Sequence, residues 1–101
     1  MLTFIRSDTF DRWLKELRDL KGKARILARI KSAQAGNFGD CETVGDGVSE
    51  LRIHVGPGYR VYFSRRDNIV YVLLCGGDKS SQQRDIRLAK DMARDLKDST
   101  P

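Results

Sequence analysis

The chain of 101 residues has a single histidine, two cysteines and no long apolar run. Cys41 and Cys75 stand far apart and form no CxxC pair, and with one histidine in the chain they make no zinc motif. The first ten residues lack the basic segment and apolar stretch of a secretory signal, so we expect two free thiols. No segment approaches the roughly 20 apolar residues that span a membrane. These absences predict a cytoplasmic protein without a metal, a cofactor or a membrane partner.

The composition indicates one folded domain over residues 1–101. Apolar residues make up 40% of the chain and charged residues 33%, which is an ordinary balance for a globular protein with a modest core. The net charge is +5, but residues 36–50 carry four acidic residues and no basic one. A basic surface favours a nucleic acid or an acidic protein as partner, although many small basic domains bind neither.

Apolar spacing and turn residues predict an α+β domain with helices on one side of a mostly antiparallel sheet. Asp8 can cap a first helix that Gly22 breaks, and a second helix over 23–35 completes a helical hairpin. The expected strands cover 2–6, 40–44, two runs within 50–66 joined at Gly56-Pro57-Gly58, and 69–75. The run 69–75 is apolar on both faces, as in a central strand, and a last helix begins at Ser80.

The two strands within 50–66 place apolar residues on one face and polar residues on the other, because side chains alternate along a strand. The polar set comprises Glu50, Arg52, His54, Arg60 and Tyr62. Cleavage of RNA without a metal needs a proton acceptor for the 2′-hydroxyl and cations for the charge on the phosphorane. His54 is a candidate acid or base, and Arg52, Arg60 and Lys79 are candidate cations. The alternative is a solvated face of an antiparallel sheet, where Arg, Tyr and His are ordinary residues.

Further basic residues extend this surface. Arg25 and Arg29 of the second helix, with Arg65 and the ring of Tyr62, are candidates for contact with RNA. The alternative for the helix is a solvated basic face.

The segment Gly76-Gly77-Asp78-Lys79-Ser80-Ser81 follows a strand and enters a helix. Backbone N–H groups at a helix start can hold an anion, and Lys79 stands beside them. The segment lacks the GxxxxGK[ST] spacing of a nucleotide-binding loop. The alternative is a simple turn, in which Ser80 caps the helix through a Ser80-x-x-Gln83 capping box.

Three linked patterns, FDRWLKELRD, ELRIHVGPGYRVYF and IVYVLLCGGDKSSQQRDIRLAKD, resemble the RelE/ParE toxin superfamily. The similarity covers nearly all of residues 3–96 and is greatest to the HigB-like "addiction module killer protein" branch. It implies a helical hairpin and a C-terminal helix packed on a curved, mostly antiparallel sheet. It also implies the toxin of a type II toxin–antitoxin pair, many of which cut mRNA on the ribosome by attack of the 2′-hydroxyl on the adjacent phosphate.

The resemblance places Arg52, Arg60 and Lys79 at the positions of the family's active basic side chains, with His54 and Tyr62 on the same face. It implies a cognate antitoxin with a HigA-like helix-turn-helix domain, operator DNA bound through that antitoxin, and the ribosome with its mRNA as target. One departure is the lack of a C-terminal Tyr or His, since Tyr71 is the last aromatic residue. The same fold also hosts ParE-like gyrase inhibitors, and an inactive partner-binding module is a further alternative.

Overall fold

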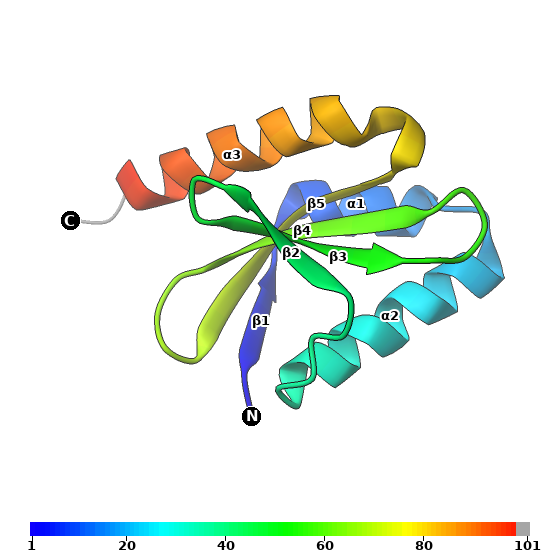
Figure 1. The fold of residues 1–101 in the computed structure, drawn as a ribbon, viewed down its shortest axis with the longest axis horizontal. Coiled ribbons are helices and arrows are strands. Elements are labelled where there is room, and N and C mark those ends of the chain that lie inside the picture. Colours follow the sequence, from blue (N-terminus) through cyan, green and yellow to red (C-terminus); the bar gives the residue numbers. More distant parts are fainter. Residues whose placement is uncertain (99–101) are drawn as a thin grey trace.

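The computed structural model describes residues 1–98 (Figure 1). Within these residues, three α-helices and one short 3₁₀ helix accompany five strands. In chain order they are β1 (Thr3–Arg6), α1 (Asp8–Glu16), α2 (Leu20–Gln34), β2 (Cys41–Gly45), β3 (Val48–Ile53), β4 (Tyr59–Arg65), β5 (Val70–Asp78), η1 (Lys79–Ser81) and α3 (Gln82–Asp98). No helix within this part of the chain is long and apolar enough to cross a membrane.

The strands form one sheet in the order β1-β5-β4-β3-β2. Only β1 and β5 run parallel, and the other three pairs are antiparallel. The predicted α+β class, with a helical hairpin and a C-terminal helix on a mostly antiparallel sheet, is confirmed. The apolar run within β5 is also central, as predicted, because β5 lies between β1 and β4.

The helices cover both faces of the sheet, so the expectation that all of them lie on one side is wrong (Figure 1). One core joins α1 and α2 to the sheet through Phe10, Leu14, Ile26, Ile30, Leu51, Ile53, Tyr59, Val61, Phe63 and Leu73. A second core joins α3 to the opposite face through Val48, Tyr62, Val72, Leu74, Cys75 and Ala89. Because β5 is apolar on both faces, each face of the sheet must pack against helices of its own.

The break between the first two helices lies earlier than predicted. Helix α1 ends at Glu16, and Asp19 caps α2 by accepting a hydrogen bond from the Gly22 N–H at 3.0 Å. Gly22 therefore sits inside α2 and does not break a helix. A Cβ atom there would lie 2.5 Å from the Tyr59 ring, so this glycine serves close packing of the helix on the sheet.

Strand β5 is also longer than predicted, because Gly76 and Gly77 continue it. A Cβ atom at Gly76 would meet the Trp13 ring at 2.3 Å, and one at Gly77 would meet an Asp85 carboxylate oxygen at 1.8 Å. Both glycines thus permit close approach of a helix on each side of the strand. The cysteines are free, as expected, with Cys41 against the first core and Cys75 inside the second.

Candidate active site

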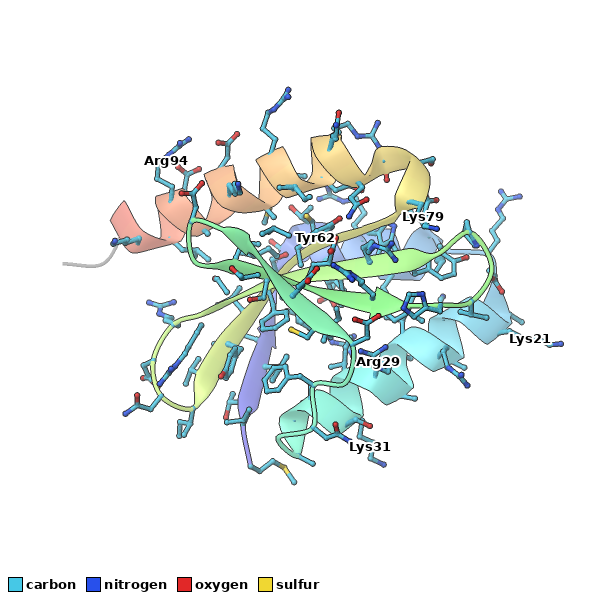
Figure 2. The ribbon with its side chains drawn as sticks, in the orientation of Figure 1. Lys21, Arg29, Lys31, Tyr62, Lys79 and Arg94 are labelled. Carbon is cyan, nitrogen blue, oxygen red and sulfur yellow. The ribbon has the colours of Figure 1, made fainter. Side chains whose placement is uncertain are left out.

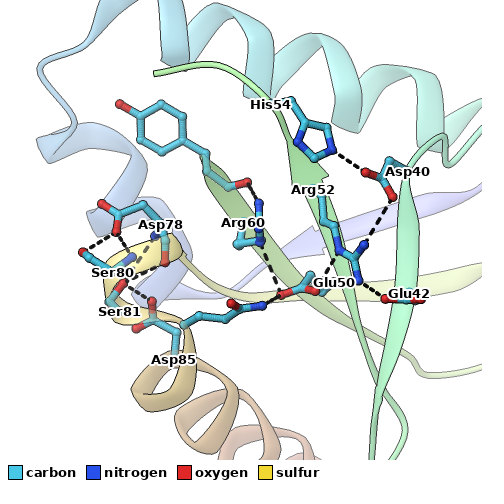
Figure 3. Close-up of polar contacts among 12 residues, drawn as sticks. Asp40, Glu42, Glu50, Arg52, His54, Arg60, Asp78, Ser80, Ser81 and Asp85 are labelled. Carbon is cyan, nitrogen blue, oxygen red and sulfur yellow. Dashed lines mark hydrogen bonds and ion pairs between the residues drawn. The ribbon is translucent and has the colours of Figure 1, made fainter. Parts of the chain in front are cut away.

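Strand register brings the four predicted catalytic residues to one end of the sheet. Arg52 pairs with Arg60 across β3 and β4, and Arg60 pairs with Gly77 of β5. His54 follows the last residue of β3, and Lys79 follows the last residue of β5. Figure 3 shows His54, Arg52 and Arg60 along this end of the sheet. The predicted catalytic residues therefore lie close together in space.

These four side chains differ sharply in their access to solvent. The side chain of His54 is 66% exposed, that of Arg52 is 29% exposed and that of Arg60 is only 6% exposed. Lys79 is exposed and forms no ion pair within residues 1–98 (Figure 2). A Cβ atom at Gly58 would lie 3.4 Å from Lys79 Cδ and 3.8 Å from Arg60 Nη1, so the stem of Lys79 and the guanidinium of Arg60 flank the same turn.

Three carboxylates surround Arg52, and the sequence alone did not predict these contacts. Arg52 Nε donates to Glu50 Oε2 at 3.2 Å, Arg52 Nη1 lies 3.9 Å from Asp40 Oδ1, and Arg52 Nη2 contacts Glu42 Oε2. All three acidic residues come from the acid-rich segment 36–50, whose composition was the one feature of the sequence that pointed to them. The polar end of this face is consequently an ion-pair network and not an open basic surface.

Glu50 is the centre of that network and is almost fully buried. Its Oε1 accepts a hydrogen bond from Gln82 Nε2 at 2.8 Å and lies 3.6 Å from Arg60 Nε (Figure 3). A buried carboxylate is tolerated when cations and donors surround it, and Glu50 has Arg52, Arg60 and Gln82. This carboxylate therefore ties β3 and β4 to the start of α3.

Tyr62 does not lie on an open surface, which corrects its predicted role in stacking on RNA. The residue is 0% exposed and packs between the sheet and α3 (Figure 2). Its hydroxyl has no hydrogen-bond partner in the described part of the chain. Burial, and then the nearby charge of Glu50, raise the pKa of this phenol. A base cannot stack on the ring while α3 covers it.

The turn into α3 is capped by Asp78 and not by Ser80. The Asp78 carboxylate accepts the Ser80 N–H at 2.8 Å, and the Ser81 hydroxyl accepts the Asp78 N–H at 3.3 Å. The backbone donor expected to hold an anion is thus bonded to a carboxylate, whose charge disfavours a second anion there. Lys79 remains the available cation of this turn.

The other predicted RNA-binding residues lie outside this cluster. Arg29 donates to the backbone carbonyls of Arg52, Phe38 and Asp40 at 2.5, 2.9 and 3.1 Å, so it fastens the loop before β2 to α2. Arg65 bonds Asn68 Oδ1 at 2.6 Å in the β4–β5 turn, and Arg25 is exposed on α2. Contact of these arginines with RNA stays a prediction.

No group of three or more His, Cys, Asp or Glu side chains among residues 1–98 is arranged to hold a metal ion. The side chains gathered at the site offer imidazole, guanidinium, ammonium and carboxylate groups.

Comparison with known proteins identifies relatives that match most of the chain. The sequence model of the family described as "Phage derived protein Gp49-like" matches residues 12–97. A protein of Haemophilus influenzae, described as uncharacterized, is 54% identical over 88 residues, which cover 87% of this chain and 89% of that protein. The residues that the family model matches, 12–97, include every predicted site residue.

Proposed function

The chain belongs to the Gp49-like family of RelE/HigB-like toxins, and from this premise we propose that it is a HigB-like, ribosome-dependent endoribonuclease of a type II toxin–antitoxin system. The single observation that carries the proposal is the convergence of Arg52, His54, Arg60 and Lys79 at one end of one sheet face. A proton acceptor and several cations at one place are what metal-independent cleavage of RNA requires.

Each residue has a separate part in the proposed reaction. His54 takes the proton of the 2′-hydroxyl, whose oxygen attacks the adjacent phosphorus, and the bond to the 5′-oxygen breaks as that oxygen takes a proton from water. Arg52 and Lys79, the more accessible cations, neutralise the charge on the phosphorane oxygens. Arg60 is buried and acts from beneath, by holding Glu50 and adding positive charge below Arg52.

Translation-linked mRNA cleavage with purified ribosomes tests this function. Lys79→Ala removes an exposed cation that makes no ion pair within the described residues, so the variant should fold normally. Its rate of mRNA cleavage should fall roughly 10-fold or more. Lys31→Ala on α2 is the matched control, because Lys31 is an exposed lysine away from the site (Figure 2). Equal cleavage by both variants and the wild type would remove Lys79 from the site. Intact mRNA with the wild type would refute the nuclease itself.

The carboxylates around Arg52 favour a second candidate, a non-enzymatic ParE-like inhibitor of DNA gyrase. Asp40, Glu42 and Glu50 neutralise much of the charge that a phosphate would meet. A supercoiling assay separates the two candidates, since gyrase inhibition with intact mRNA supports the inhibitor. Absence of growth arrest on expression would support the third candidate, an inactive partner-binding module.

The family implies a cognate antitoxin as partner. We propose that this antitoxin has a HigA-like helix-turn-helix domain and connects the toxin to operator DNA, and that the toxin acts in the cytoplasm. Co-expression with the neighbouring short reading frame tests the pair: relief of growth arrest and co-purification are expected.

A further inference from the structure

His54 and Asp40 form a pair that brackets the β2–β3 hairpin. His54 follows the end of β3, Asp40 precedes β2, and His54 Nε2 contacts Asp40 Oδ2 (Figure 3). The backbone of Asp40 is held in place, because its carbonyl accepts the Arg52 N–H at 2.9 Å and Arg29 Nη2 at 3.1 Å. The carboxylate therefore meets the imidazole from a fixed position.

The state of the carboxylate decides which imidazole nitrogen carries the proton. The contact with His54, and then the charges of Arg52 and Arg29, lower the pKa of Asp40 below its ordinary value, although partial burial opposes this. An ionised carboxylate can only accept, so Nε2 must be the nitrogen with the hydrogen. The lone pair of the neutral ring then lies on Nδ1, which has no hydrogen-bond partner among the described residues.

We propose that Asp40 is the positioning residue of His54, holding the imidazole in the Nε2–H form so that Nδ1 is the base of the cleavage reaction. The inference rests on the proposed nuclease function. Nδ1 takes the proton of the attacking 2′-hydroxyl, the new bond forms between the 2′-oxygen and phosphorus, and the bond to the 5′-oxygen breaks as that oxygen takes a proton from water. The resulting imidazolium keeps its Nε2–H on Asp40, which stabilises the developing positive charge.

Arg52 makes the substitution Asp40→Asn informative. Arg52 Nη1 lies 3.9 Å from Asp40 Oδ1, and a guanidinium can face only an acceptor. In the variant the amide oxygen should turn toward Arg52, and the amide NH₂ toward His54. His54 Nε2 must then accept, so the proton moves to Nδ1 and the proposed base is lost.

Nitrogen-15 NMR of the imidazole shows directly which ring nitrogen carries the proton, because His54 is the only histidine in the sequence. At a pH where the ring is neutral, the wild type should show the Nε2–H tautomer and Asp40→Asn the Nδ1–H tautomer. Glu42→Gln is the matched control: it also removes one carboxylate from Arg52, but Glu42 does not touch His54. Asp40→Glu keeps an acceptor-only carboxylate and should keep Nε2–H. An Nε2–H signal in Asp40→Asn would overturn the proposal.

Cleavage kinetics on the ribosome complete the test. Asp40→Asn should lower kcat on the order of 10²-fold, and His54→Ala should do the same. The double variant should be no slower than either single variant, because both substitutions remove the same function. If the wild type cleaves mRNA and Asp40→Asn cleaves it equally fast, the proposed role of Asp40 is wrong while the nuclease function stands. A wild type that leaves mRNA intact would overturn the nuclease function and with it the catalytic role of this pair.

Discussion

Glu50 and Arg60 form an ion pair that is almost completely shielded from water. Their side chains are 2% and 6% exposed, and Glu50 Oε1 lies 3.6 Å from Arg60 Nε. The other carboxylate oxygen accepts from Arg52 Nε, so one acid holds two arginines of adjacent strands. The pair therefore fixes β3 to β4 beneath Arg52, one of the cations proposed to face the phosphate.

Removal of Glu50 should destabilise the protein strongly. Glu50→Ala leaves Arg60 buried without its carboxylate, which typically costs about 3–5 kcal/mol. Glu42→Ala removes a carboxylate from Arg52 as well, but the Glu42 side chain is 62% exposed, so its loss should cost about 0–1 kcal/mol. Urea unfolding of both variants measures the two values. Similar losses in both would show that burial of the Glu50–Arg60 pair is not what matters.

Release of Arg52 should strengthen RNA binding. Glu42→Gln removes one of three carboxylates that compete with phosphate for this guanidinium. KM for ribosome-bound mRNA should fall roughly 2- to 5-fold, which corresponds to the ~0.5–1 kcal/mol of an exposed ion pair. Asp46→Asn is the control, because it changes the net charge equally but pairs with Lys90. An equal fall in both variants would indicate a general charge effect.

Periodicity predicted the number, type and order of the main elements, because each has a clear apolar pattern and a turn or cap near its ends. It misplaced the ends where glycine was taken for a break. Gly22, Gly76 and Gly77 lie inside elements, since Tyr59, Trp13 and Asp85 leave no room for a Cβ atom. Such contacts between distant segments are invisible in local sequence.

The candidate site was predicted in part for a similar reason. Alternation along the strands placed Arg52, His54 and Arg60 on one face, and the register confirms that Arg52 and Arg60 are neighbours. It could not show that α3 covers Tyr62 on that face. The acid-rich segment 36–50 was visible, but only the β2–β3 hairpin shows that its carboxylates meet Arg52.

The buried thiol of Cys75 should make the protein sensitive to alkali. Burial, and then the charge of Asp85, raise the pKa of Cys75 from 9.0 to about 12. Above pH 9 the unfolded chain loses this proton while the folded protein keeps it, so stability falls as pH rises toward 12. The slope for one such group approaches ~1.4 kcal/mol per pH unit.

Unfolding free energies measured between pH 8 and 11 test this, with Cys75→Ala as the variant. The variant should show a shallower decline between pH 9 and 10. Above pH 10 a decline should persist, because burial and Asp19 raise the pKa of Tyr59 to about 12. Parallel curves for wild type and variant would exclude Cys75 as the group responsible.

Asp19 should contribute stability that is lost in acid. Its carboxylate accepts the Gly22 N–H at 3.0 Å and the Tyr59 hydroxyl at 2.8 Å, and these two bonds lower its pKa below the ordinary 3.8. The folded state therefore binds this proton less readily than the unfolded chain. The contribution is complete above pH 3.8 and disappears as pH falls through the lowered value.

Asp19→Asn keeps an acceptor for the cap of α2 but has no charge to titrate. Its stability should be lower than that of the wild type at pH 7, and the two proteins should converge as pH falls below 3.8. Tyr59→Phe is the matched comparison: it removes the bond that lowers the pKa of Asp19 less and leaves the cap, so a dependence on acid should remain. If the gap between wild type and Asp19→Asn is constant from pH 7 to pH 2, the cap acts through its geometry alone and its charge contributes nothing.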